Sequence, residues 1–159
     1  MINSKLIYKV LGQLLFIEAF LLFISLLVAY YYQQDDIFAF IVATLITIGG
    51  GLILKWKGHG ADNSMSRRDA YLVVSLSWII FSLFGTLPFM VSGYINNFTD
   101  AYFETMSGFT TTGATILDDV ECVPHGLLFW RSLTQWIGGL GIVFFSIALL
   151  PSLVGGQTK

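Results

Sequence analysis

Apolar residues gather along the chain in long runs that are separated by short polar stretches. Runs of about 20 residues, the length that crosses a bilayer as a helix, occupy residues 6–32, 37–56, 70–93 and 124–150. The first run carries one charge near its middle, Glu18, and the third contains Pro88 near its end. We predict an all-α integral membrane protein with four transmembrane helices, the third of them kinked at Pro88.

The stretch between the third and fourth runs has a different pattern, and it is too short for another full crossing. Residues 98–109 have the periodicity of a short amphipathic helix, with Thr99 or Asp100 available as its N-cap. Residues 110–115 follow as Thr-Thr-Thr-Gly-Ala-Thr, a β-branched run without a helical period. We predict a re-entrant half-length helix and an extended loop, in which Gly113 is free to take a positive φ.

This predicted loop has the chemistry of a cation site. A helix that enters halfway directs its C-terminal carbonyl groups toward the bilayer centre. Extended backbone beside it can align carbonyl oxygens that replace the hydration shell of an ion. Neutral oxygen ligands favour a large monovalent cation over a divalent one. The candidate filter residues are Thr110, Thr111, Thr112 and Gly113. The alternative is an ordinary extracellular turn between two helices.

Composition and charge narrow the class further. Of 159 residues, 55% are hydrophobic and 11% are charged, whereas soluble domains have about 25% charged residues. A water-soluble globule is therefore excluded, and the absence of a basic cluster argues against nucleic-acid binding. Seven of the eight Lys and Arg residues flank the runs on one side, which predicts cytoplasmic termini. The opposite loops are acidic and form an expected cation-attracting mouth with Asp35, Asp36, Asp100, Asp118, Asp119 and Glu121.

Two charged positions inside the predicted spans need partners. We expect Arg131 to pair with Glu104 on the half-length helix and so to support the pore, although it can also snorkel outward or donate to loop carbonyls. We expect Glu18 to be protonated or hydrogen-bonded toward a neighbouring helix, with Gln13 as a candidate partner; the alternative is a proton or cation relay. Three glycines of the fourth run are expected to permit close helix contact: Gly138, Gly139 and Gly141.

Three motifs carry a resemblance to a known family. They are FTDAYFE at 98–104, SGFTTTGAT at 107–115 and FWRSLTQWIGGLGI at 129–142. In this order they resemble the Trk/Ktr/HKT superfamily of potassium transporters, and most closely the bacterial Trk-type membrane subunit. The likeness extends over nearly the whole chain.

The resemblance implies an N-terminal transmembrane helix pair in residues 1–60 and the first helix–pore loop–helix repeat of a pseudo-four-fold channel in residues 61–159. It implies potassium uptake across the bacterial inner membrane, with potassium sites at Thr111 and Thr112, no cofactor and no enzymatic activity. The implied partners are three further pore repeats, a second copy in a homodimer and a cytoplasmic nucleotide-binding regulatory subunit. One repeat is a quarter of such a pore, so we expect this chain to be a fragment of a longer transporter.

Two other functions are alternatives. An intramembrane serine protease would use Ser107 or Ser132 with His125, but the chain has no Gly-x-Ser-x-Gly motif. A small membrane scaffold without ion transport would use the Thr-rich segment only as a turn.

Overall fold

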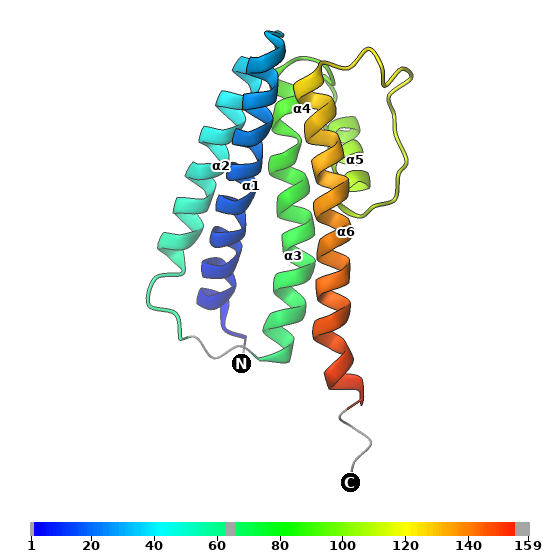
Figure 1. Cartoon of the computed structure of the whole chain (residues 1–159). Coiled ribbons are helices and arrows are strands. Elements are labelled where there is room, and N and C mark those ends of the chain that lie inside the picture. Colours follow the sequence, from blue (N-terminus) through cyan, green and yellow to red (C-terminus); the bar gives the residue numbers. More distant parts are fainter. Residues whose placement is uncertain (1, 63–65, 155–159) are drawn as a thin grey trace.

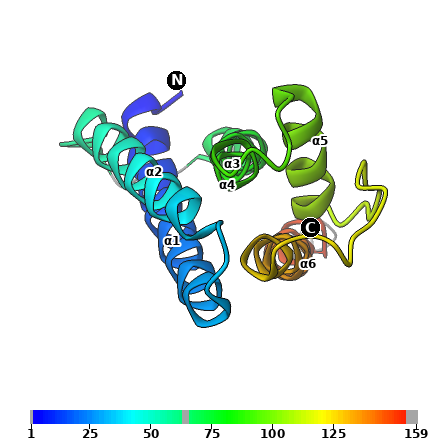
Figure 2. The ribbon, with the colours of Figure 1, turned by 90° about the horizontal axis from the view of Figure 1, so that it is seen from above.

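The chain forms a bundle of helices in a computed structural model that describes residues 2–62 and 66–154, with backbone only for residues 67, 142 and 144–154. The helices are α1 (Ser4–Tyr32), α2 (Ile37–Lys57), α3 (Arg67–Gly85), α4 (Leu87–Val91), α5 (Phe98–Phe109) and α6 (His125–Val154). No strand occurs among the described residues, in agreement with the predicted all-α class. Figures 1 and 2 show the α1–α2 pair on one side, α3 and α4 in the middle, and α5 and α6 on the other side.

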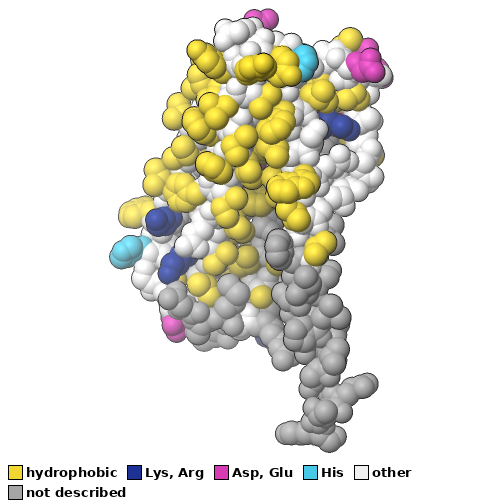
Figure 3. All heavy atoms as spheres, viewed as in Figure 1, with side chains coloured by type: hydrophobic (Ala, Val, Ile, Leu, Met, Phe, Trp, Pro, Cys, Tyr) yellow, Lys and Arg dark blue, Asp and Glu magenta, His cyan; other side chains and the backbone are white. Residues whose placement is uncertain are grey.

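Within the part of the chain that the structure describes, three helical segments are long and apolar enough to cross a membrane, namely Ser4–Tyr32, Ile37–Lys57 and Arg68–Val91. Apolar side chains cover much of the surface along the bundle, as Figure 3 shows. The third segment joins α3 and α4 across Thr86, two residues before Pro88, which lacks the N–H that a continuous helix needs. Helix α6 has 30 residues and continues past the predicted end at residue 150. The arrangement of four crossings and one re-entrant helix stays a prediction.

Most basic residues lie at one end of the bundle, and most acidic residues lie at the other. The start of α1, the end of α2 and the start of α3 lie together at one end (Figure 1), and they carry Lys5, Lys9, Lys55, Lys57 and Arg68. The α1–α2 turn and the start of α6 lie at the opposite end, where most of the acidic residues are. Lys159 lies outside the described residues, and the orientation of the chain in a membrane stays a prediction.

One buried cluster connects the N-terminal helix pair to the rest of the chain. Phe40 of α2 packs in the same core as Phe89 of α4, Phe109 of α5 and Trp130 of α6. All four side chains are at most 2% exposed. The two predicted units, residues 1–60 and 61–159, therefore pack against each other through a shared core, and their boundary stays a prediction.

Glu18 is buried in the middle of α1. Its side chain is 1% exposed, and neither carboxyl oxygen has a hydrogen-bond partner in the described part of the chain. The predicted bond to Gln13 is wrong, because five helical positions place the two residues on different faces, and Gln13 is exposed. The carboxyl group instead lies beside the helix break, where a Cβ on Gly85 would be 3.4 Å from its Oε1.

Candidate ion-binding loop

Helix α5, which precedes the loop, begins and ends at the predicted residues but has a different N-cap. The side chain of Asn97 accepts a hydrogen bond from the Thr99 N–H at 3.0 Å. The predicted caps, Thr99 and Asp100, were wrong because both residues lie inside the first turn. The helix dipole stabilises the negative charge of Asp100 at this position. Figure 1 shows α5 beside only the upper part of the bundle, after which the chain returns to the upper end to start α6.

The loop starts with a tight closure of α5 rather than with extended backbone. The Thr112 N–H donates to the Ser107 carbonyl at 3.0 Å, and the Thr111 N–H donates to the Gly108 carbonyl at 2.9 Å. This pair of bonds is the Schellman pattern, which usually has Gly in the left-handed position. Here Thr111 occupies that position with a φ of 55°, a conformation that costs a β-branched residue about 1–2 kcal/mol. The extended run predicted from Thr110 was therefore wrong for its first two residues.

Beyond this closure the loop exposes backbone oxygens. Gly113 has a φ of 77°, as its predicted freedom to take a positive φ allows. The hydroxyl groups of Thr110 and Thr112 lie 2.8 Å apart, and residues 110–116 are all exposed. No group in the described part of the chain donates a hydrogen bond to the carbonyl oxygens of residues 110–113. These carbonyl oxygens are free to coordinate a cation or to accept a hydrogen bond.

A buried carboxylate holds the far end of the loop. Glu104 of α5 accepts from the Arg131 Nε of α6 at 2.6 Å, so the predicted contact between these two side chains is present. The same carboxylate accepts from the Thr115 hydroxyl at 2.9 Å and from the Ile116 N–H at 3.0 Å. The Glu104 side chain is 1% exposed and the Arg131 side chain is 18% exposed. Thr115 was not singled out as a partner, because nothing local in the sequence marks it as one.

The loop and α5 also pack directly against α6. The Ser107 hydroxyl donates to the Ala114 carbonyl at 2.6 Å, and the space enclosed behind the loop leaves no room for a water molecule. A Cβ on Gly138 would collide with the Phe109 carbonyl, so the predicted close contact is present at Gly138. A Cβ on Gly139 or Gly141 would meet its nearest neighbour at 3.9 Å or 3.5 Å, which is ordinary contact, so the close approach predicted for the three glycines occurs at Gly138 and not at these two.

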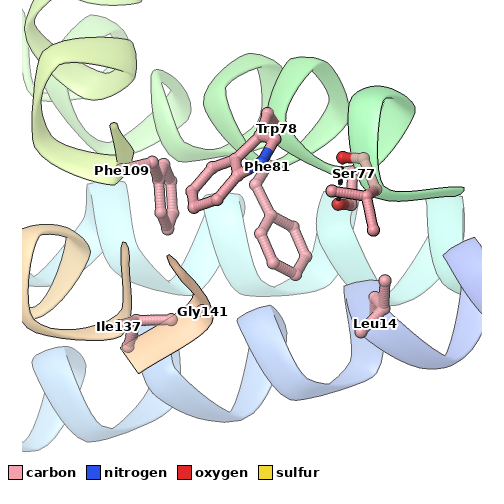
Figure 4. A pocket seen from close by; sticks show the side chains of 8 residues that line it. Leu14, Ser77, Trp78, Phe81, Phe109, Ile137 and Gly141 are labelled. Atoms are coloured by element: carbon pink, nitrogen blue, oxygen red, sulfur yellow. Dashed lines mark hydrogen bonds between the residues drawn. The ribbon is translucent and has the colours of Figure 1, made fainter. Parts of the chain in front are cut away.

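An apolar pocket of about 260 Å³ lies below the end of α5. Figure 4 shows Trp78, Phe81, Phe109 and Ile137 around it. The Ser77 hydroxyl in its wall donates to a backbone carbonyl of its own helix at 2.7 Å. The described lining therefore offers no free polar group to a cation, and the pocket is separate from the candidate ion site.

The acidic residues expected around an outer mouth do not all face solvent. Asp100, Asp118 and Asp119 line an open hollow of about 560 Å³ beside the loop. The Cys122 thiol donates to Asp119 at 3.0 Å; this bond and the Glu121 N–H hold the pKa of Asp119 below its usual range, and the same carboxylate raises the pKa of the thiol. Asp36 differs from the prediction, since it is 1% exposed and contacts α6.

The residues of the alternative serine protease are not arranged for catalysis. The Ser107 and Ser132 hydroxyls each donate to a backbone carbonyl, of Ala114 and Leu128. His125 contacts the side-chain oxygen of Gln34. Neither serine is bonded to His125, so the described residues contain no activated nucleophile of this kind.

Comparison with known proteins gives one consistent result. A family model described as TrkH, cation transport protein, matches residues 33–159. The Trk system potassium uptake protein TrkH of Halomonas elongata is 37% identical over 98% of this chain and 33% of its own length. TrkH of Escherichia coli K12 is 36% identical over 98% of this chain and 32% of its length. TrkG of the same strain is 34% identical over 99% of this chain.

A solved structure agrees with these relatives. The crystal structure of the potassium transporter TrkH from Vibrio parahaemolyticus matches with a TM-score of 0.87 and 32% identity, over 98% of this chain and 34% of the other. The chain thus spans about one third of the length of the curated relatives it matches. The relatives are transporters rather than enzymes. This chain belongs to the TrkH family of cation transport proteins.

Proposed function

We propose that this chain supplies one of four pore-loop units of a potassium-uptake transporter. Residues 110–113 form one wall of its selectivity filter, and Thr111 and Thr112 contribute directly to potassium sites. The observation that supports this most is the set of free carbonyl oxygens on residues 110–113, in a loop whose far end is held by the Glu104–Arg131 pair through Thr115 and Ile116. Carbonyl oxygens held in this way can replace the hydration shell of a potassium ion.

The proposed setting is a bacterial inner membrane with both chain termini in the cytoplasm. In this orientation the basic end of the bundle faces inward, as the positive-inside rule requires, and α5 enters from outside as a re-entrant pore helix. The α3–α4 segment and α6 flank it, and α1 and α2 cross the membrane beside this unit. The exposed loop is then covered by protein, which irregular backbone at membrane depth needs.

The proposed partners follow from the number of units that a pore requires. Three further pore repeats complete the filter, because one loop surrounds only about a quarter of an ion path. A homodimer and a cytoplasmic nucleotide-binding regulatory subunit are proposed from the resemblance alone. We expect the 159-residue chain by itself to support no potassium flux in vesicles. Robust flux from the purified chain would instead make it a self-sufficient subunit.

The filter assignment is tested by two matched glycines in the full-length gene product. Gly113 and Gly93 have φ values of 77° and 72°, and a Cβ on either would meet its nearest neighbour at 3.8 Å. Replacement by Ala therefore strains both backbones similarly, by about 1–2 kcal/mol, and creates no steric clash at either position. Gly113→Ala is expected to lower the ratio of potassium to sodium uptake, because it disturbs the carbonyls of the filter.

Gly93→Ala is expected to leave that ratio unchanged at a similar protein level. The measurement is tracer uptake at limiting potassium with and without sodium, normalised to the amount of protein in the membrane. Gly108 is an unsuitable control, because a Cβ there would collide with the Thr134 side chain. Equal uptake ratios for both Ala variants would mean that residues 110–113 form a turn rather than a filter.

A further inference from the structure

The N-terminus of α6 is capped by a part of the chain that is distant in sequence. The His125 N–H donates to the side-chain oxygen of Gln34 at 2.7 Å, and the Leu127 N–H donates to Asp36 Oδ2 at 3.2 Å. In both bonds the two residues are 91 positions apart. The residue before α6 is Pro124, whose side chain has no acceptor for these N–H groups. The α1–α2 turn therefore supplies a cap that the local sequence lacks.

This contact is closely fitted and buried. Asp36 is 1% exposed, and a Cβ on Gly126 would collide with its Oδ2 and with the side chains of Ala29 and Phe40. Because Gly126 has no side chain, the backbone of α6 can approach the carboxylate closely. A carboxylate at the N-terminus of a helix is also favoured by the helix dipole. Sliding or rotating α6 would break both the cap and this packing.

The first turns of α6 also carry the residues that hold the ion-binding loop. Leu127 and Arg131 are four positions apart, so they lie on the same face about 6 Å from each other along the helix. Arg131 bonds to Glu104 at 2.6 Å, and Glu104 bonds to Thr115 and Ile116 of the loop. A displacement of α6 at Leu127 is therefore transmitted to the loop through one rigid helical turn and one ion pair.

We propose that Asp36, assisted by Gln34, is a positioning residue for potassium selectivity. The α1–α2 turn fixes the height and rotation of α6, and α6 fixes the filter loop through the Arg131–Glu104 pair. Asp36 itself touches no ion in this mechanism. The inference rests on the proposed function, because it requires residues 110–113 to form a selectivity filter. Asp36 and Gln34 lie outside the repeat that contains this filter and act on it through α6.

The positioning role of Asp36 can be tested in the full-length gene product, with the adjacent Asp35 as a control. Asp36→Ala removes the acceptor, Asp36→Asn keeps an oxygen acceptor without the charge, and Asp35→Ala changes the adjacent, exposed carboxylate. Asp36→Ala is expected to lower the ratio of potassium to sodium uptake at equal protein level, because the filter loop is then no longer held at one height and rotation of α6. Asp36→Asn should recover most of that ratio, and Asp35→Ala should leave it unchanged.

The amount of protein in the membrane and a second variant show whether the turn positions the filter or only stabilises the fold. If Asp36→Ala is poorly produced, Gln34→Leu removes only the contacts with the backbone N–H and the ring nitrogen of His125, and it should lower the ratio in the same direction. A lower protein level with an unchanged ratio in both variants would overturn the inference, since the turn would then only stabilise the fold. Gly113→Ala is measured in parallel. If it lowers the ratio and neither turn variant does, the inference fails and the proposed function stands; if Gly113→Ala has no effect, both fail.

Discussion

The ion pair behind the loop gives the sharpest energetic test of how the loop is held. We consider Arg131→Met, Glu104→Gln and the double variant, which change charge with little change in side-chain size. In the native structure the Glu104 carboxylate has one charged donor at 2.6 Å and two neutral donors, Thr115 and Ile116. The side chain of Glu104 is 1% exposed, so water cannot replace a lost partner.

The two single variants are expected to differ in cost. Arg131→Met leaves a buried carboxylate without its counter-charge, which typically costs about 3–5 kcal/mol; the two remaining donors favour the lower end of that range. Glu104→Gln leaves Arg131, which is 18% exposed and can reach water, so a loss of about 1–3 kcal/mol is expected. The double variant contains neither charge. It should be less destabilised than the sum of the two single variants by about 2 kcal/mol.

The assay is unfolding of the purified full-length protein in detergent, paired with potassium uptake at equal protein level. Because both side chains contact the same loop, each single variant should also lower uptake, and the double variant should recover part of it. Additive losses in unfolding free energy, within about 0.5 kcal/mol, would refute the reasoning. They would mean that Glu104 and Arg131 act independently despite their contact.

Three further outcomes are expected from single substitutions. Gly138→Ala should reduce assembled protein far more than Gly139→Ala, because only the first Cβ collides with the α5 backbone; equal levels would contradict this packing. Glu18→Met should raise the unfolding free energy by about 1–3 kcal/mol, since it removes a buried carboxyl group that has no hydrogen-bond partner among the described residues. A loss of stability would reveal a partner for that carboxyl. Asp119→Asn should lower the pKa of Cys122 and so speed its maleimide labelling near neutral pH, where more thiolate forms; an unchanged rate would contradict their hydrogen bond.

Much of the secondary structure could be predicted from the sequence, because helices are local. The bonds of a helix join residues four positions apart, so long apolar runs indicated α1 and α2, and Pro88 indicated the break before α4. The same local reasoning predicted the bounds of α5 and a positive φ at Gly113. The Glu104–Arg131 contact was predictable as well, since a charge inside an apolar run needs a partner nearby.

Only the tertiary structure decided how these elements hold one another. Thr111 takes the left-handed position that its own preference opposes, because closure of α5 requires a residue there. Glu18 has no polar partner among the described residues, since the packing of α1 places Gly85 rather than a donor beside it. The cap of α6 comes from Asp36, 91 residues from its partner. Such contacts depend on how helices distant in sequence pack together, and the pattern of a single run does not encode that arrangement.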